Sequence, residues 1–403
     1  MKSILLTTTA LVAFAGAAAA EGHTGVSFSG EASLGYNDDD RQGNTEGFYW
    51  DAELGVALAA ELDNGVMAGA EFTIDFSDNN LGDVLESAGY VLSLTTEDAG
   101  LFFGDVSFAA EKHWVATGWM RSDKFSEADG ETAIRGDLKV GGFDTSISYV
   151  LSNNEGTRTV ENDIDQLSLG ARGDIGNFNI SIAYQAQSDE AAGFYSARPA
   201  VIAPALADPD LPFQGDPTLP DFNPAVVGTD IRGDNGDFTA AETFGISVGT
   251  TVAGANVRLA YADNSVTDSI GLSASYPVGP VTLSAAYVVE SDSDDSWRLR
   301  AVYADGPVSL TANYEERIGI ARYNVEGSYD LGNGVVARAG YLDRDNWNGE
   351  AFYVSGTYDL GSGAELLVSY AEANDTLTGF RADDEVGAPE YQVGTTVEVS
   401  FKF

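Results

Sequence analysis

A short stretch of the chain, residues 111–131, concentrates side chains that could act on charged molecules. It also holds His113, one of only two histidines in the sequence. A hydrolytic triad needs a histidine between a nucleophile and an acid, and no such arrangement can be assembled around this one. We therefore expect no enzymatic activity, and we regard the carboxylates as a source of electric field. Those carboxylates are Glu111, Asp123, Glu127, Asp129 and Glu131.

The same stretch is apolar for a long connection between two strands. It contains Trp114, Trp119, Met120 and Phe125. Long loops are normally polar and exposed, so we expect residues 109–132 to be partly buried against another part of the molecule. The interpretation we favour is a loop that folds back into the lumen of a wide β-barrel and narrows it.

The rest of the chain has the pattern that such a barrel requires. Almost every segment after residue 24 alternates apolar and polar residues with a period of two, which is typical of half-buried strands. Residues 50–62 and 68–76 alternate in this way around the turn Asp63-Asn64-Gly65. Counting two strands around each short turn gives about 20 strands. Because hairpins can be miscounted, we expect an even number of roughly 16–20.

The connections between these strands are of two kinds. Short turns alternate with longer polar segments such as 77–87, 153–163 and 374–389. Short periplasmic turns and long extracellular loops are typical of a transmembrane antiparallel β-barrel. We therefore predict an all-β fold in which residues 21–403 form one such barrel.

Parity predicts which side chains face the lumen. Arg298 and Arg300 share one face of segment 296–304, and Trp297 and Leu299 share the other. An Arg or Lys facing lipid at mid-membrane costs about 2–4 kcal/mol, so the charged face lines the lumen. The basic pore-wall residues predicted in this way are Arg135, Lys139, Arg172, Arg258, Arg298 and Arg300, with Arg322 and Arg338.

Two interpretations of these basic residues stay open. Facing the loop carboxylates across a narrow pore, they would create a transverse field that orients dipolar solutes and sets ion preference. Alternatively, they form ordinary ion pairs with neighbours such as Asp137 and Glu326. A soluble β-sandwich would alternate in the same way, but the turn asymmetry and the tyrosines near strand ends favour the membrane barrel.

The N-terminus has the features of a secretory signal peptide over residues 1–20. Lys2 precedes an apolar run, and Ala18-Ala19-Ala20 offers a cleavage site of small residues. No later segment approaches the length of a transmembrane helix.

Composition excludes several classes of function. The net charge of −43 excludes nucleic acid as a partner, because phosphate binding needs a basic surface. The absence of cysteine removes thiol chemistry and zinc–thiolate sites. The 44% of hydrophobic residues is too high for a disordered acidic chain.

Two kinds of loop could carry further roles. Segment 190–240 holds seven of the eleven prolines, so it is not a strand but an extended external loop that could cap the barrel or contact a neighbouring subunit. Acidic clusters at 38–40, 230–237, 292–295 and 383–385 could hold calcium loosely, although such loops are more often simply solvated. We expect no other cofactor and no specific metal site.

Three motifs in order along the chain give it a resemblance to a known family. They are 26–32 (VSFSGEA), 100–105 (GLFFGD) just before the long loop, and 399–403 (VSFKF) at the end. With these motifs the chain resembles the general porins of the Gram-negative outer membrane, most closely the alphaproteobacterial type. Such porins have about 16 strands, so the higher count here leaves the pore width open.

The resemblance implies an integral outer-membrane location, contact with lipid and lipopolysaccharide, and a homotrimer. It also implies passive diffusion of small hydrophilic solutes and an inward loop after the fifth strand. Phe403 would be the terminal signal for the barrel-assembly machinery.

The function we expect is a water-filled channel for ions and small hydrophilic solutes with a weak cation preference. One alternative is a substrate-specific porin, which would carry a run of aromatic residues along the lumen face. The other is a plugged structural or adhesive surface barrel that acts through segment 190–240.

Overall fold

The computed structural model describes residues 25–38, 47–79, 82–127, 132–151, 164–188, 239, 241–344, 349–373, 386–387 and 392–403. The predicted signal peptide, nearly all of the proline-rich segment 190–240, and Asp129 and Glu131 lie outside these residues.

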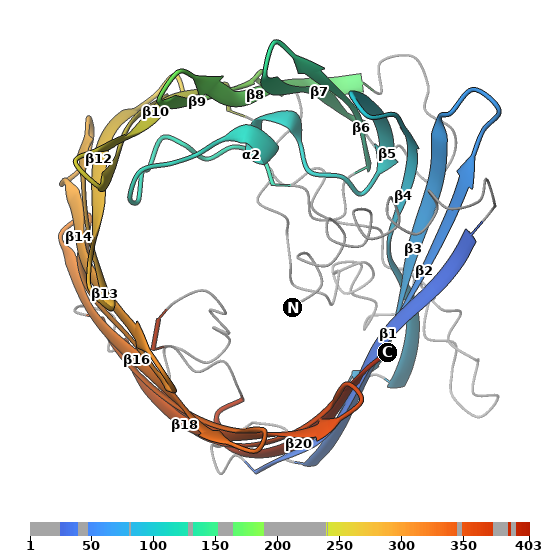
Figure 1. Ribbon diagram of the computed structural model, residues 1–403, viewed down its shortest axis with the longest axis vertical. Coiled ribbons are helices and arrows are strands. Elements are labelled where there is room, and N and C mark those ends of the chain that lie inside the picture. The colour runs from blue at the N-terminus through green and yellow to red at the C-terminus, as the bar shows by residue number, and fades with distance from the viewer. Residues whose placement is uncertain are drawn as a thin grey trace, which may run out of the picture.

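Twenty antiparallel strands form one closed sheet (Figure 1). Each strand pairs with the next along the chain, and β1 closes the ring against β20 with Leu34 opposite Val399. The even-numbered barrel predicted from the alternating pattern is therefore confirmed, at the upper end of the predicted range. The strands are β1 Gly25–Asp38, β2 Gly47–Glu61, β3 Met67–Asn79, β4 Gly82–Thr95, β5 Ala99–Gly104, β6 Thr132–Val140, β7 Phe143–Leu151, β8 Ile164–Ile175, β9 Phe178–Gln185, β10 Thr243–Val252, β11 Ala255–Asp263, β12 Asp268–Val278, β13 Val281–Glu290, β14 Ser296–Asp305, β15 Val308–Arg317, β16 Ile320–Gly332, β17 Val335–Arg344, β18 Gly349–Gly361, β19 Ala364–Ala373 and β20 Gly394–Lys402.

The tight turns lie where Gly, Asn and Asp cluster in the sequence. In the two similar turns after β16 and β18, Asn333 and Gly334 have φ of 55° and 83°, and Ser362 and Gly363 have φ of 56° and 82°. Positive φ at both central positions matches the right-handed twist of the flanking strands, which is why such turns close hairpins. These turns hold neighbouring strands in register.

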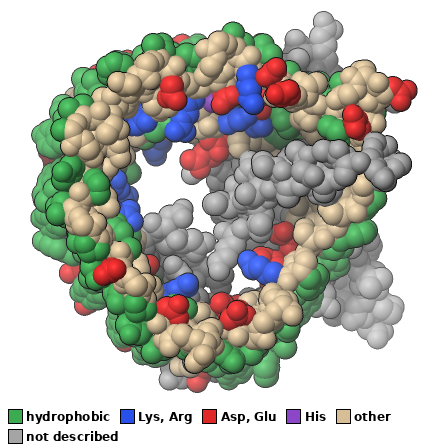
Figure 2. All heavy atoms as spheres, viewed as in Figure 1, with side chains coloured by type: hydrophobic (Ala, Val, Ile, Leu, Met, Phe, Trp, Pro, Cys, Tyr) green, Lys and Arg blue, Asp and Glu red, His purple; other side chains and the backbone are tan. Residues whose placement is uncertain are grey.

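The two faces of the barrel have opposite character. Leu259 and Leu299 point outward and are 54% and 53% exposed, whereas Arg258 and Arg298 beside them in sequence lie on the inner face. In Figure 2 hydrophobic side chains cover the outside of the ring, and Lys, Arg, Asp and Glu gather on its inner side. An apolar surface of this extent suits lipid and not water.

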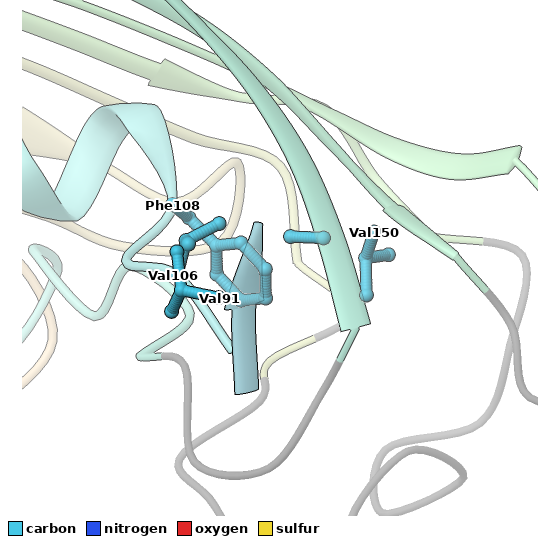
Figure 3. Packing of buried hydrophobic residues seen from close by; sticks show 5 residues of the cluster. Val91, Val106, Phe108 and Val150 are labelled. Carbon is cyan, nitrogen blue, oxygen red and sulfur yellow. The ribbon is translucent and has the colours of Figure 1, made fainter. Parts of the chain in front are cut away.

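A small apolar cluster fixes the start of the segment that follows β5. Phe108 and Val106 from this segment pack with Val91 of β4 and Val150 of β7, all of them buried (Figure 3). The short helix α2, Ala109–His113, follows directly. Among the described residues, no helix has the length and apolarity to cross a membrane.

Candidate functional site in the barrel lumen

The segment after β5 lies inside the ring. Its residues 105–127, which we call the lumen segment, run along the inner face of β7 to β13, with α2 beside β8 and β9 (Figure 1). The loop predicted over residues 109–132 contains this segment up to residue 127, and residues 128–131 lie outside the described residues.

The wall beneath the lumen segment is a belt of small side chains. Residues directly opposite one another across β7 to β12 form one row on the inner face: Ser146, Gly170, Ala183, Gly245, Ala262 and Ser269. A Cβ at Gly170 would lie 2.0 Å from the carbonyl oxygen of Ala109, and one at Gly245 would lie 2.5 Å from the ring of Trp114. The small-residue belt therefore gives the lumen segment its room.

Polar side chains of the wall bind the backbone of the lumen segment. Ser148 Oγ accepts from the Ala109 amide at 2.9 Å, and Ser168 Oγ accepts from the Ala110 amide at 2.8 Å. Further along, Ser269, Gln185 and Glu290 accept from the amides of Ser122, Ser126 and Arg121. Because buried amides need acceptors, these contacts hold the segment flat against the wall.

Three of the predicted loop carboxylates, Glu111, Asp123 and Glu127, lie within the described residues, and their surroundings differ. Glu111 Oε2 accepts from the Phe108 amide at 3.2 Å and so satisfies a donor at the start of α2. Asp123 Oδ2 accepts from Trp114 Nε1 at 3.0 Å, and burial raises the pKa of this carboxyl to about 6. Glu127 is exposed.

His113 of the lumen segment is buried against the wall and contacts Ser146 Oγ of β7 through Nε2 at 2.7 Å. Burial, followed by repulsion from Lys112, lowers the pKa of the imidazole to about 4. The histidine is therefore neutral at physiological pH, and its surroundings are those of a packing residue.

Arg135, predicted as a pore-wall residue, anchors the lumen segment. Its Nε donates to Asp137 Oδ1 at 3.0 Å, and its Nη1 donates to the Ser107 carbonyl oxygen at 2.6 Å. The guanidinium also lies 4.8 Å from the centre of the Phe102 ring. Arg135 therefore forms an ion pair with a neighbouring acid, which is one of the two interpretations left open by the sequence.

The other predicted basic residues lie on the inner face but at different places along it. Arg258, Arg298 and Arg300 occupy β11 and β14. Lys139 and Arg172 are exposed, on β6 and β8. Arg322 and Arg338 lie on β16 and β17, where Arg322 is directly opposite Glu315.

The sequence interpretation missed an acidic row on the first strands. Glu31, Glu53 and Asp75 lie directly opposite one another across β1, β2 and β3, on the face away from the exposed Phe28 and Phe72. Figure 1 places these strands and β14 to β16 on opposite sides of the ring. The charges that face each other across the lumen therefore come from two walls of the barrel. Strand parity could have found these carboxylates had it been applied to the first strands.

The other predicted sites are the terminal residue Phe403 and the acidic clusters considered for calcium. Phe403 is 77% exposed and exchanges two backbone hydrogen bonds with Gly30 of β1. No group of three or more His, Asp or Glu in the described ranges is arranged to hold a metal ion. Of the acidic clusters considered for calcium, 292–295 is described, whereas 39–40, 230–237 and 383–385 lie outside the described residues.

Comparison with known proteins bears on what this lumen does. A family model described as Gram-negative porin matches residues 7–204 and 220–378. A triple mutant of Rhodopseudomonas blastica porin is 14% identical, with 94% of this chain and 100% of that chain covered and a TM-score of 0.38. Another mutant of the same porin is 15% identical over the same shares, with a TM-score of 0.39. At such TM-scores the structural likeness carries no argument, so the assignment rests on the family model. A comparison with curated proteins gives no match.

Proposed function

The chain belongs to the Gram-negative porin family, and we propose that its outer-membrane channel passes ions and small hydrophilic solutes by passive diffusion with a weak preference for cations. The observation that carries this proposal is the inverted polarity of the barrel. Apolar side chains such as Leu299 face outward, while Arg298 and Glu53 face the lumen. A charged, hydrated interior lowers the barrier for ions and polar solutes.

The lumen segment sets the exclusion size in this proposal. It occupies the lumen side of β7 to β13, and its backbone is hydrogen-bonded to the wall at several points. A solute must therefore pass between it and the part of the wall that it leaves uncovered, which includes Glu31, Glu53 and Asp75. Passage next to these carboxylates, in a chain of net charge −43, supports the preference for cations.

We also propose that the channel assembles as a homotrimer in contact with lipid and lipopolysaccharide, and that the barrel-assembly machinery recognises Phe403. Support comes from the family and from the exposed terminal side chain. Native electrophoresis with and without chemical cross-linking should give a species of three chains. A monomer under both conditions would contradict the assembly without touching the channel.

Single-channel recording in a planar bilayer under a potassium chloride gradient tests the channel itself. We expect stepwise openings whose reversal potential is biased towards the equilibrium potential of the cation. Insertion of folded protein without any conductance would exclude the channel, and a reversal potential biased towards chloride would exclude the cation preference.

A further inference from the structure

A recess in the lumen wall lies between the lumen segment and the short turns. It has a volume of about 580 Å³ and is bounded by β8 to β14. Its lining includes Arg258, Arg298, Asn179, Ser273, Ser275 and Ser284. The volume falls within the range of about 300–1,000 Å³ that holds small-molecule ligands.

Strand register explains how the recess is built. Arg258, Ser273, Ala286 and Arg298 are directly opposite one another across β11 to β14, so the two arginines stand at the ends of one row. Three strand spacings of about 4.8 Å place their Cα atoms roughly 14 Å apart. Ser273 and Ala286 lie between the two arginines, and their small side chains leave space between the two guanidinium groups.

Arg258 is held in place before any solute arrives. Its Nη1 donates to Ser247 Oγ at 2.8 Å, and its Nη2 donates to Asn179 Oδ1 at 2.9 Å. A Cβ at Gly249 would lie 2.8 Å from Nη2, so the glycine leaves the space in which the guanidinium lies. A pre-positioned guanidinium loses less conformational entropy on binding an anion.

Arg298 and Arg300 retain free hydrogen-bonding capacity. Neither forms a hydrogen bond or ion pair within the part of the chain that the structure describes, although Glu315 lies directly opposite Arg298. The Nε of Arg300 is buried without a partner, and Arg300 is directly opposite Ser284 of the recess. Of these two arginines, Arg298 lines the recess, so its guanidinium is open to an incoming acceptor.

The other polar groups of the recess are mainly uncharged. Serine hydroxyls both donate and accept, so they can bind the hydroxyl groups of a solute. Asp174 is the carboxylate among the lining residues, and its Oδ1 already accepts from Asn179 Nδ2 at 3.0 Å. The chemistry of the recess is therefore two guanidinium groups separated by hydroxyls.

We propose that this recess is a transient binding subsite for anionic polyhydroxylated solutes, the class of sugar phosphates and sugar acids. The proposal rests on the channel function proposed above and names a class of solute for it. Guanidinium binds phosphate or carboxylate through paired hydrogen bonds, and the serine hydroxyls bind the polyol. Because the recess is open to water, binding is weak enough for the solute to leave, as transport requires.

Blockade of single-channel current tests the subsite on the full-length protein. Glucose 6-phosphate is the probe, and glucose and inorganic phosphate are the controls that lack one half of the chemistry. We expect the half-blocking concentration of glucose 6-phosphate to be at least tenfold lower than that of either control. Equal values for glucose 6-phosphate and phosphate would overturn the proposal, because the serine hydroxyls would then contribute nothing.

Substitutions inside and outside the recess test whether blockade by glucose 6-phosphate occurs there. Arg298→Gln should raise the half-blocking concentration of glucose 6-phosphate about tenfold, which corresponds to about 1.4 kcal/mol. Lys402→Gln is the matched control, because it removes a lumen-facing charge on β20 away from the recess. An equal effect of both variants would show general electrostatics and overturn the subsite. Ser273→Ala with Ser284→Ala should weaken blockade by glucose 6-phosphate and leave that by inorganic phosphate unchanged.

The outcomes for the channel and for the subsite are separable. Normal potassium chloride conductance without any blockade by glucose 6-phosphate would overturn the subsite alone. The absence of conductance would overturn the channel, and the subsite with it.

Discussion

The indole Nε1 of Trp114 donates a hydrogen bond to Oδ2 of Asp123 at 3.0 Å, closing the lumen segment on itself. The Trp114 ring also packs against Phe125, with ring centres 5.6 Å apart, and covers Gly245 of the wall. The Trp114 side chain therefore contacts both halves of the lumen segment and packs against β10. The docking of this segment should therefore respond to changes at Asp123.

Asp123 should make docking weaker as pH rises. Burial raises the pKa of the docked carboxyl to about 6 from an ordinary value of 3.8, with a small further effect from Glu290, and opposing effects from Trp114 and Lys124. The docked state therefore binds the proton more tightly than the undocked state, and its contribution is present below about pH 4 and lost by about pH 6. Taken alone, this titration should raise open-channel current noise over this interval.

Asp123→Asn is the variant that isolates this titration, because the amide oxygen still accepts from the Trp114 indole. Its current noise should be nearly independent of pH between 4 and 6 once the contribution of His113 is removed as well. For the Asp123→Asn single variant, a pH dependence of current noise identical to that of the unmodified protein would exclude a contribution from Asp123.

Titration of His113 should change the docking of the lumen segment in the opposite direction, weakening it as pH falls. Burial and the neighbouring charges of Lys112 and Arg135 lower the pKa of its imidazole to about 4, against the opposing pull of Asp137 and Asp144. An undocked histidine takes up a proton below about 6.5, so docking is fully stabilised above that pH and weakens as pH falls towards 4. His113→Gln should abolish this acid sensitivity.

The two titrations nearly cancel between pH 4 and 6, so each becomes visible only when the other is removed. Each single variant should therefore show a steeper dependence of current noise on pH than the unmodified protein, with slopes of opposite sign. Equal slopes in both variants would contradict the assignment of either group.

The alternating pattern predicted the barrel because each strand has one apolar and one polar face, a property of single strands. The aromatic residues around Trp114 predicted a partly buried stretch, and Met120 and Phe125 within it are buried. The small-residue belt was not predictable in the same way. Gly170 and Gly245 are unremarkable within their own strands, and only the register across β7 to β12 aligns them.

The charged side chains were predictable to the same extent as the small-residue belt, because their partners depend on register between strands. Parity places Arg258 and Arg298 on the inner face, but their meeting around one recess depends on three intervening pairings. The use of Glu111 to satisfy the start of α2 depends on backbone geometry that composition does not carry. Sequence therefore predicts the face on which a charge lies better than the partner it finds.

A larger side chain in the small-residue belt should displace the lumen segment. Gly170→Ala would place a methyl group 2.0 Å from the Ala109 carbonyl oxygen, a backbone atom that cannot rotate away. Overpacking of this kind costs about 1–3 kcal/mol, so we expect displacement of the lumen segment and a larger single-channel conductance. Gly356→Ala is the matched control on β18, because nothing lies within 4 Å of the added atom. Unchanged conductance in Gly170→Ala would mean that the lumen segment does not limit the pore.

The acidic row should set part of the ion preference. Glu53 lies between Asp75 and Glu31, and Glu31 is paired with Lys402 at 3.1 Å, so the charge of Glu53 adds mainly to that of Asp75. A unit charge about 8 Å from an ion in water contributes roughly 0.5 kcal/mol, so Glu53→Gln should lower the cation-to-anion permeability ratio about twofold. Arg300→Gln on β14 should shift the ratio the other way. Reversal potentials at about 0.1 M salt measure both effects, which should fade near 1 M as screening shortens the range of the charges. Equal ratios for both variants and the unmodified protein at low salt would rule out these walls as the source of selectivity.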